Sequence, residues 1–318
     1  MTAQSTTSTT LDVACHLNVV VPDLSPGTLP EALAAIATAG YARVVLPPVD
    51  PESTDAAVLR AAFADHGLVP ITIAGQGPGA DVSSADADER AAGAAALRAS
   101  VDLTAALGSD QMNGVPYGVF GHPAGPTSAA AFDRAAHEVG AVADYAHERG
   151  ITMTFEVLNR YETSVINTAA QALVFVAASG SEHLRIHLDT FHMAVEEADM
   201  AAAVLLALPK LSYLELGQSG RGRLGTGSVD IEGIVRTARD AGYAGRWGVE
   251  AFSRSVLSVG AADMLAIWRS PYDQGAELAT DAMRLIERAW TTSGHGPEAA
   301  RRAASDRTEA DHAPRRNE

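Results

Sequence analysis

The sequence predicts an α/β fold, a single (β/α)8 TIM barrel, and three observations lead to this prediction. Short β-like apolar runs alternate with segments of helical period along most of the chain. Such alternation is typical of parallel strands joined by helical crossovers. About eight of these units fit into roughly 280 residues, which favours a closed barrel over an open doubly wound sheet. No Gly-x-Gly-x-x-Gly turn follows the first expected strand, so the mark of a dinucleotide-binding sheet is missing.

The expected elements follow one another in regular order. The expected strands are residues 13–21, 42–47, 69–74, 111–115, 152–158, 184–190, 211–216 and 247–252. The expected helices are residues 30–39, 56–66, 87–107, 130–149, 169–178, 200–208, 231–241 and 273–289. Several helices end just before a glycine, which readily takes the left-handed conformation that closes a helix. These glycines are Gly40, Gly67, Gly108, Gly150 and Gly242.

Composition limits the classes of protein to which the chain can belong. Its net charge of −16 argues against a phosphate-backbone partner, because nucleic-acid binders need a concentrated basic face. The single cysteine, Cys15, excludes an internal disulfide framework. No apolar stretch of about 18 residues is present, so we expect no membrane span, and the N-terminus lacks the features of a signal peptide. We therefore expect a cytoplasmic protein.

The two ends differ in composition from the middle of the chain. Residues 1–11 are rich in Ser and Thr, and residues 291–318 are charged and poor in large apolar side chains. Such segments cannot bury enough apolar surface to offset the loss of chain entropy. We expect disordered tails at 1–11 and 291–318 around a single barrel domain at 12–290.

Four successive expected strands, the fifth to the eighth, each bring one carboxylate to their C-terminal end, where barrel enzymes carry their chemistry. An inward carboxylate among apolar neighbours is costly unless it is paired or bound to a cation. Pairing with a nearby arginine can account for one or two of them, so we expect a shared cation or a role in proton transfer. The four carboxylates belong to Glu156, Asp189, Glu215 and Glu250.

The motifs around these carboxylates resemble those of a known family. The run Glu156-Val-Leu-Asn159-Arg160-Tyr-Glu162 precedes Leu-Asp189-Thr-Phe-His192-Met, then Leu-Gly217 with Arg221, then Glu250-x-Phe. In this order and spacing they resemble the ketose 3-epimerases of the D-tagatose/D-allulose 3-epimerase group, in the xylose-isomerase-like barrel superfamily. The similarity is densest between residues 150 and 255 and weaker over the rest of the barrel.

The resemblance implies an isomerase that epimerises C3 of a ketose, the carbon next to the carbonyl. It implies that Glu156 and Glu250 are the acid–base pair on opposite faces of C3, and also metal ligands together with Asp189. A divalent ion, usually manganese, cobalt or magnesium in that group, would bind the ketose oxygens O2 and O3.

The resemblance also implies the residues that bind the sugar. His192 and Arg221 would hold hydroxyl or carbonyl oxygens of the substrate, and Glu162 would support the binding network. Enzymes of this group often form homodimers or homotetramers, so we expect one of these assemblies, with a sugar-like small molecule as the other partner and neither nucleic acid nor membrane.

Asn113 and Tyr117 follow the fourth expected strand, where barrel loops contact substrate, and either substrate binding or a plain turn explains them. On the first strand, His16 could line the pocket, but packing is the expected role for it.

One position departs from the family pattern. The group has a histidine ligand in a His-Leu-Gly-Glu run where this chain reads Glu215-Leu-Gly217-Gln218. Four carboxylates still suit a hard cation, and oxygen-only ligation favours magnesium, manganese or calcium. Alternatively, the ion is lost and the crowded carboxylates share protons. A third alternative is that His187, which faces inward beside Asp189, replaces the missing imidazole, although such barrel histidines are more often packed.

Two other functions remain open at this point. A changed ligand could accompany a metal-independent lyase, dehydratase or isomerase acting on a sugar-derived or secondary metabolite. A binding protein with a dead site is the non-catalytic alternative. A nuclease is disfavoured by the acidic charge and the missing histidine-rich metal cluster.

Overall fold

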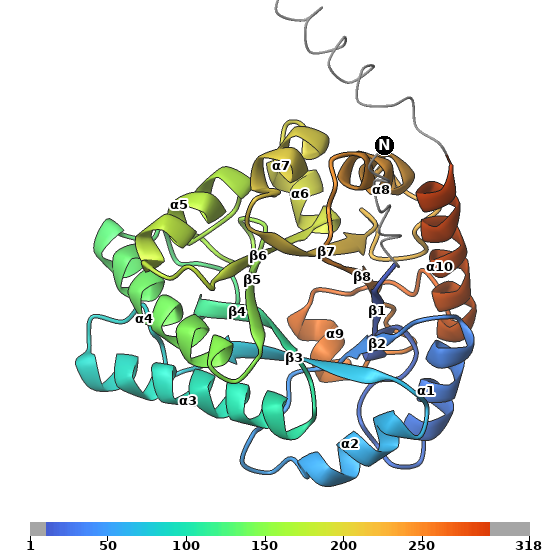
Figure 1. Cartoon of the computed structure of the whole chain (residues 1–318), viewed down its shortest axis with the longest axis horizontal. Coiled ribbons are helices and arrows are strands. Elements are labelled where there is room, and N and C mark those ends of the chain that lie inside the picture. Colours follow the sequence, from blue (N-terminus) through green and yellow to red (C-terminus); the bar gives the residue numbers. More distant parts are fainter. Residues whose placement is uncertain (1–10, 293–318) are drawn as a thin grey trace, which may run out of the picture.

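The computed structural model describes residues 11–292, which form a closed barrel of eight parallel strands in sequential order (Figure 1). The predicted (β/α)8 barrel is therefore confirmed. The tails predicted at 1–11 and 291–318 fall almost entirely outside the described residues. The strands are β1 (Val13–His16), β2 (Arg43–Val45), β3 (Val69–Gln76), β4 (Gln111–Val119), β5 (Thr152–Val157), β6 (Arg185–Asp189), β7 (Leu211–Gly217) and β8 (Arg246–Glu250).

Helices surround the barrel, and one helix or more follows each strand (Figure 1). Within the described part of the chain, no helix is long and apolar enough to cross a bilayer. The helices are α1 (Leu29–Thr38), α2 (Ala56–Ala64), α3 (Ala87–Ala106), α4 (Ala129–His147), α5 (Ala169–Ser179), α6 (Thr190–Glu196), α7 (Met200–Ala207), α8 (Ile231–Asp240), α9 (Val259–Met264) and α10 (Gly275–Thr291).

The predicted helix ends are confirmed by their backbone angles. Each of the five glycines that the sequence places after a helix has a positive φ, between 67° at Gly67 and 96° at Gly40. A side chain is strained in this conformation, whereas glycine adopts it freely. Glycine therefore lets each helix end sharply, and the chain enters the next strand within a few residues.

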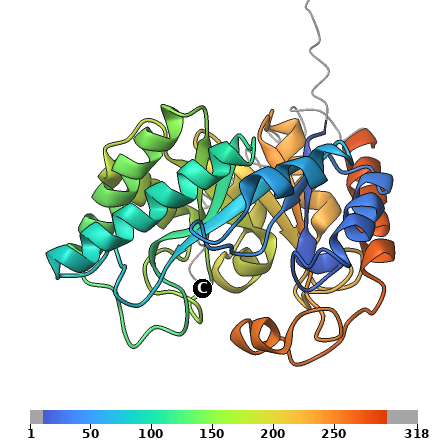
Figure 2. The same ribbon diagram turned by 90° about the horizontal axis from the view of Figure 1, so that it is seen from below.

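Three of the differences from the sequence prediction change the C-terminal end of the barrel. β1 ends at His16, because the chain turns into a 3-10 helix at Leu17–Val19 instead of continuing as a strand to residue 21. α6 begins directly after β6, since the Asp189 carboxylate accepts a hydrogen bond from the Phe191 N–H at 2.9 Å and so caps the helix. The segment after β8 folds into α9, which projects from one end of the molecule (Figure 2, orange).

The main core lies between the barrel and its helices, and a smaller apolar layer fills the barrel itself. Ala14, Val45, Ile71 and Tyr213 form this inner layer, and each is at most 1% exposed. Interior layers of this kind close a barrel to solvent and give the groups above them a rigid floor. The layer separates the C-terminal ends of the strands from the N-terminal ends.

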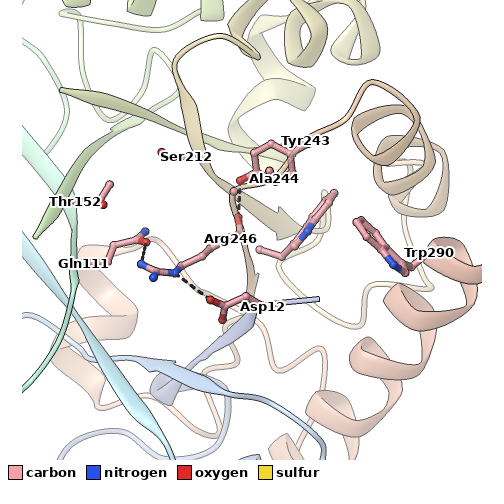
Figure 3. Close-up of a pocket in the computed structure, with 10 residues that line it drawn as sticks. Asp12, Gln111, Thr152, Ser212, Tyr243, Ala244, Arg246 and Trp290 are labelled. Carbon is pink, nitrogen blue, oxygen red and sulfur yellow. Dashed lines mark hydrogen bonds and ion pairs between the residues drawn. The ribbon is translucent and has the colours of Figure 1, made fainter. Parts of the chain in front are cut away.

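At the N-terminal ends, charged residues pair with one another around a cavity of about 260 Å³ (Figure 3). Arg246 lies at the centre, donating to Asp12 at 3.1 Å, to Gln111 at 2.6 Å and to Asp110 at 2.5 Å. Arg43 donates to the same two aspartates. Each carboxylate therefore meets two guanidinium groups, which is the arrangement of a structural ion-pair network.

Candidate active site

The four carboxylates expected at the C-terminal ends of β5 to β8 lie together above the inner apolar layer. Asp189 and Glu215 are 0% exposed and Glu250 is 7% exposed, while the Glu156 side chain is 15% exposed. Asp189 on β6 is the register partner of Glu215 on β7. The structure thus collects negative charge in a nearly dry place, where it needs cations or protons to compensate it.

Glu215 lies between two histidines. Its Oε1 is 2.8 Å from Nε2 of His16, and its Oε2 is 3.1 Å from Nε2 of His187. Gly248 leaves room for this carboxylate, because a Cβ at Gly248 would clash with Oε1 of Glu215. Burial would raise the pKa of Glu215, but the two imidazoles outweigh burial and hold its pKa well below the usual value. Glu215 is therefore charged at neutral pH.

His16 is a site residue for which the sequence analysis expected only a packing role. Its Nδ1 also lies 3.5 Å from Oε1 of Glu250, so the ring connects two carboxylates. Burial lowers the pKa of His16, but Glu215 and Glu250 outweigh that effect and raise it to about 9. His16 is the last residue of β1, and a position at a strand end could have indicated a site residue. The sequence did not show this, because the expected strand continued to residue 21.

Arg221 contacts two of the carboxylates. Its Nη1 donates to Glu250 and lies 3.5 Å from Oδ2 of Asp189, while its guanidinium stacks 3.6 Å over the Phe191 ring. Burial lowers the pKa of Arg221, but Glu250 and Asp189 outweigh it and raise the pKa above its usual value. Arg160, which follows β5, does not compensate these four carboxylates, because it pairs with Glu196.

The loop that carries Arg221 is held by the side chain of Gln218. The Gln218 Nε2 donates to the carbonyls of Leu224 at 3.0 Å and Val229 at 3.1 Å. Its Oε1 accepts from the N–H groups of Ser219 and Val229. Arg221 itself has a φ of 55°, a left-handed conformation that side chains rarely adopt. An amide both donates and accepts here, which a carboxylate could not do, and this accounts for glutamine at position 218.

The other three carboxylates have raised pKa values. Burial raises the pKa of Glu156, of Glu250 and, most strongly, of Asp189, to which Glu250 adds like-charge repulsion. Within residues 11–292, Glu156 forms no ion pair with an arginine, and its Oε1 lies 3.4 Å from Nε2 of His192. A raised pKa makes a carboxylate easier to protonate, as a group that takes up and releases a proton during a reaction requires.

His192 is fixed in one tautomer by Asn159. The Asn159 main-chain N–H donates to Nδ1 of His192 at 3.1 Å, and the side-chain amide lies 2.8 Å from the same atom. Nδ1 is therefore an acceptor, and the ring hydrogen lies on Nε2, which faces Glu156 and Asp189. Burial and then Arg221 lower the pKa of His192 to about 3, so the ring stays neutral.

A cavity of about 430 Å³ opens beside these groups at the same end of the barrel. Glu162, Asn159 and Arg221 line it, and an apolar rim with Phe252 and Trp268 surrounds its mouth. A space of this size accommodates a monosaccharide-sized ligand. Of the residues predicted to bind the sugar, Arg221 and Glu162 line this cavity, whereas His192 and the four carboxylates are not among its lining residues.

Asn113 and Tyr117, two predicted substrate-binding residues, are not among the residues that line this cavity. Tyr117 is fully buried, and its hydroxyl donates to the main-chain carbonyl of Glu156 at 2.8 Å. Asn113 accepts hydrogen bonds from Gln111 and Thr154 inside the barrel. Both lie on β4, and Tyr117 does so because β4 continues to Val119 and does not end at residue 115.

The donor atoms fit a divalent cation. Within the described residues, three overlapping groups have donor atoms within 4.8 Å of one another, and Glu156 and Glu215 each belong to two of them. Both carboxylate oxygens of Glu215 and both ring nitrogens of His187 are buried without a hydrogen bond. Buried polar atoms without hydrogen bonds are rare, and a cation would satisfy them. The groups are His16–Glu215–Glu250, Glu156–His187–Glu215 and Glu156–Asp189–His192.

The fold and the site together are those of a barrel with carboxylates gathered at the C-terminal ends of its strands. A family model described as a xylose isomerase-like TIM barrel matches residues 33–288. The chain belongs to this family, and its similar relatives in it are ketose 3-epimerases.

Two relatives match nearly the whole barrel. The ketose 3-epimerase of Arthrobacter globiformis is 36% identical over 276 residues, which cover 87% of this chain and 96% of the relative. The L-ribulose 3-epimerase of Mesorhizobium japonicum is 36% identical over 293 residues, 92% of this chain and 96% of the relative. A solved structure of D-allulose 3-epimerase from Methylomonas sp. in complex with D-allulose has a TM-score of 0.84 at 32% identity, covering 88% of this chain and 97% of that one.

Proposed function

We propose that the chain is a ketose 3-epimerase that inverts C3 of a ketose by transferring a proton from one face to the other. The relatives named above carry this activity in their names. The observation that carries the proposal is the placement of Glu156 and Glu250 around one buried site. They lie on β5 and β8, with β6 and β7 between them, and both have raised pKa values.

The two glutamates act in sequence. One of them, deprotonated, removes the C3 proton, and the electrons of the C–H bond move toward the carbonyl to form an enediolate. The other, protonated, then delivers its proton to the opposite face of C3, which forms the new C–H bond. Because one acid starts charged and the other neutral, the pair needs only one proton between them.

Glu156, Asp189, Glu215 and Glu250 would hold a divalent cation. When bound, it would stabilise the negative charge that develops on the substrate oxygen. Oxygen donors favour manganese or magnesium.

His192, Arg221 and Glu162 position the sugar. The Nε2–H of His192 is a fixed donor for a substrate oxygen, since Asn159 occupies the other ring nitrogen. The guanidinium of Arg221 offers its charge to the oxygens around C3 from the cavity wall. Glu162 accepts from the Asn159 amide at 3.0 Å and so supports the same network.

Hydrogen exchange at C3 tests the proposal. The metal-loaded protein is incubated in D2O with D-allulose or L-ribulose, the sugars named for its relatives. We expect deuterium at C3 of both the substrate and its epimer, with no deuterium at C4 or C5. Loss of exchange on metal removal would support a metal-assisted reaction, whereas unchanged exchange would show the metal-independent alternative.

If no ketose exchanges hydrogen at C3, the result would contradict the proposal and favour a lyase or a binding protein. The homodimer or homotetramer stays a prediction, which light scattering of the purified protein would test.

A further inference from the structure

We infer that His187 supplies an imidazole ligand to the cation, together with Glu156 and Glu215. This inference rests on the proposed function, because it concerns the cation of the same site. It replaces an oxygen-only ligand set by one that contains nitrogen. It also assigns a role to a residue that carries no part of the proton transfer.

The position of His187 carries the inference. His187 is 2% exposed, and its Nε2 lies 3.1 Å from Oε2 of Glu215. Donor atoms of His187, Glu156 and Glu215 lie within 4.8 Å of one another, as ligands of one ion must. Among residues 11–292, neither ring nitrogen makes a well-aligned hydrogen bond, although Nε2 is in close contact with Glu215. The edge of the Tyr213 ring packs against the imidazole at 4.7 Å, which holds its orientation.

His192 cannot provide this nitrogen. Its Nδ1 accepts from the Asn159 main-chain N–H, and a main-chain donor cannot be reversed by rotating a side chain. The hydrogen must therefore lie on Nε2, the atom that faces Glu156 and Asp189. A protonated nitrogen has no lone pair for a metal, so His192 remains a hydrogen-bond donor.

His16 has a different role. Its two nitrogens face carboxylate oxygens of different residues, Glu215 at 2.8 Å and Glu250 at 3.5 Å. A ring placed between these two oxygens holds the two acids apart and orients Glu215. His16 is thus a positioning residue, of the kind that tunes a metal site from outside its ligand shell.

The inference explains why Glu215 is tolerated where related enzymes have a histidine. Glu215 and His187 lie on neighbouring strands, β7 and β6, so the imidazole has moved by one strand and the site still contains one. Two carboxylates and a neutral imidazole balance the charge of a divalent ion. Imidazole also suits cobalt and zinc better than oxygen donors do.

Pulsed electron paramagnetic resonance of the full-length protein loaded with Mn²⁺ tests the ligand directly. We expect coupling of the ion to a nitrogen nucleus, and this coupling changes when the protein is made with ¹⁵N-labelled histidine. His187→Gln abolishes the coupling, whereas His16→Gln and His192→Gln retain it. Thermal unfolding of each variant checks that it is folded.

Binding constants measured by calorimetry add a second readout. Outer-shell partners typically contribute about 10- to 100-fold in metal affinity, so we expect His187→Gln to lose at least about 100-fold and His16→Gln about tenfold. The loss in His187→Gln should be larger for Co²⁺ than for Mn²⁺, because cobalt gains more from nitrogen.

Nitrogen coupling that persists in folded His187→Gln overturns the inference, and so does its absence from the wild-type protein. If His187→Gln does not fold, the labelled wild type decides together with the other two variants. Coupling in both His16→Gln and His192→Gln supports His187, and its loss in either one overturns the inference. None of these results depends on catalysis, so a failure of the proposed epimerisation would be seen separately, in the deuterium experiment.

Discussion

The two ends of the barrel both carry buried or half-buried carboxylates, but they compensate them differently. At the N-terminal end, Asp12 and Asp110 meet Arg43 and Arg246, and the two aspartate side chains remain 35% and 48% exposed. At the C-terminal end, four carboxylates that are at most 15% exposed share one arginine and three imidazoles. Those groups are Glu156, Asp189, Glu215 and Glu250 with Arg221, His16, His187 and His192.

The difference separates structural charge from functional charge. Where each acid meets two guanidinium groups and some solvent, ionisation stabilises the fold, and the pKa of Asp110 is lowered. Where acids crowd together without enough cations, pKa values rise and the site can take up protons or a metal ion. Burial with incomplete compensation is therefore the property that makes the C-terminal end the candidate active site.

The largest effect should come from removing the acid–base pair. Glu156→Gln and Glu250→Gln each lower kcat by about 10²- to 10⁴-fold, the usual contribution of a positioned acid or base. Their free energy of unfolding should stay unchanged or rise, because a buried charge is lost. Epimerisation kinetics and urea unfolding measure the two quantities.

Glu182→Gln is the matched control, since the Glu182 side chain is 90% exposed and lies outside the site. A Glu156→Gln enzyme with wild-type kcat would show that the C-terminal acids are structural.

The second-largest effect should be the loss of stability when the metal is removed. A ligand present at about 100 times its Kd stabilises the folded state by about 2.7 kcal/mol. We therefore expect the Tm to fall on treatment with EDTA and to recover with Mn²⁺. Scanning calorimetry of the wild type and of Arg246→Met should show the same metal-dependent shift in both. A Tm that does not respond to Mn²⁺ at any concentration would contradict a cation among the four acids.

Breaking the N-terminal network should reduce stability but not catalysis. Removing one partner of a fully buried ion pair costs about 3–5 kcal/mol, and the solvent around Asp12 and Asp110 reduces this to about 1–3 kcal/mol for Arg246→Met. We expect kcat within about twofold of wild type, because the inner apolar layer separates the two ends. A large loss of kcat in the folded variant would show that the two ends are coupled.

The smallest effect concerns pH. Burial raises the pKa of Asp110, but Arg246 and Arg43 outweigh burial and lower it below the ordinary 3.8. A lowered pKa means that Asp110 stabilises the fold above pH 3.8, and that this contribution is lost as the pH falls through the folded-state pKa. Asp110→Asn should thus be less stable than wild type by about 0.5–1 kcal/mol at neutral pH, and the gap should close in acid.

Urea unfolding at neutral pH and near pH 3 measures the gap. A gap that widens in acid would reverse the sign and contradict the role assigned to the arginines.

The barrel could be predicted from the sequence because the patterns that indicate it are local. Strand and helix periods, and the glycines after the helices, depend on neighbouring residues and hold in any context. The four carboxylates could be placed for the same reason, since a strand end in a barrel points to one face. The apolar run after Val13 misled, because nothing local shows that the strand stops at His16 and places that ring beside Glu215.

Contacts across the barrel could not be predicted from the sequence pattern. The tautomer of His192 depends on Asn159, 33 residues away in the chain. Tyr117 was assigned to a loop because β4 is longer than its apolar pattern, and its hydroxyl instead supports the main chain of β5. Such pairings depend on the register between elements, which one sequence does not specify.

The amide of Gln218 has a consequence for how this chain could have diverged from its relatives. Glutamate at 218 would turn an acceptor toward the carbonyls of Leu224 and Val229 and leave both without a donor. Each such loss costs about 1–3 kcal/mol. Glu215 touches none of these atoms, so the exchanges at 215 and 218 are energetically separate steps. An ancestor could have acquired either one first, and a laboratory reversal can restore the metal-side histidine without disturbing the loop.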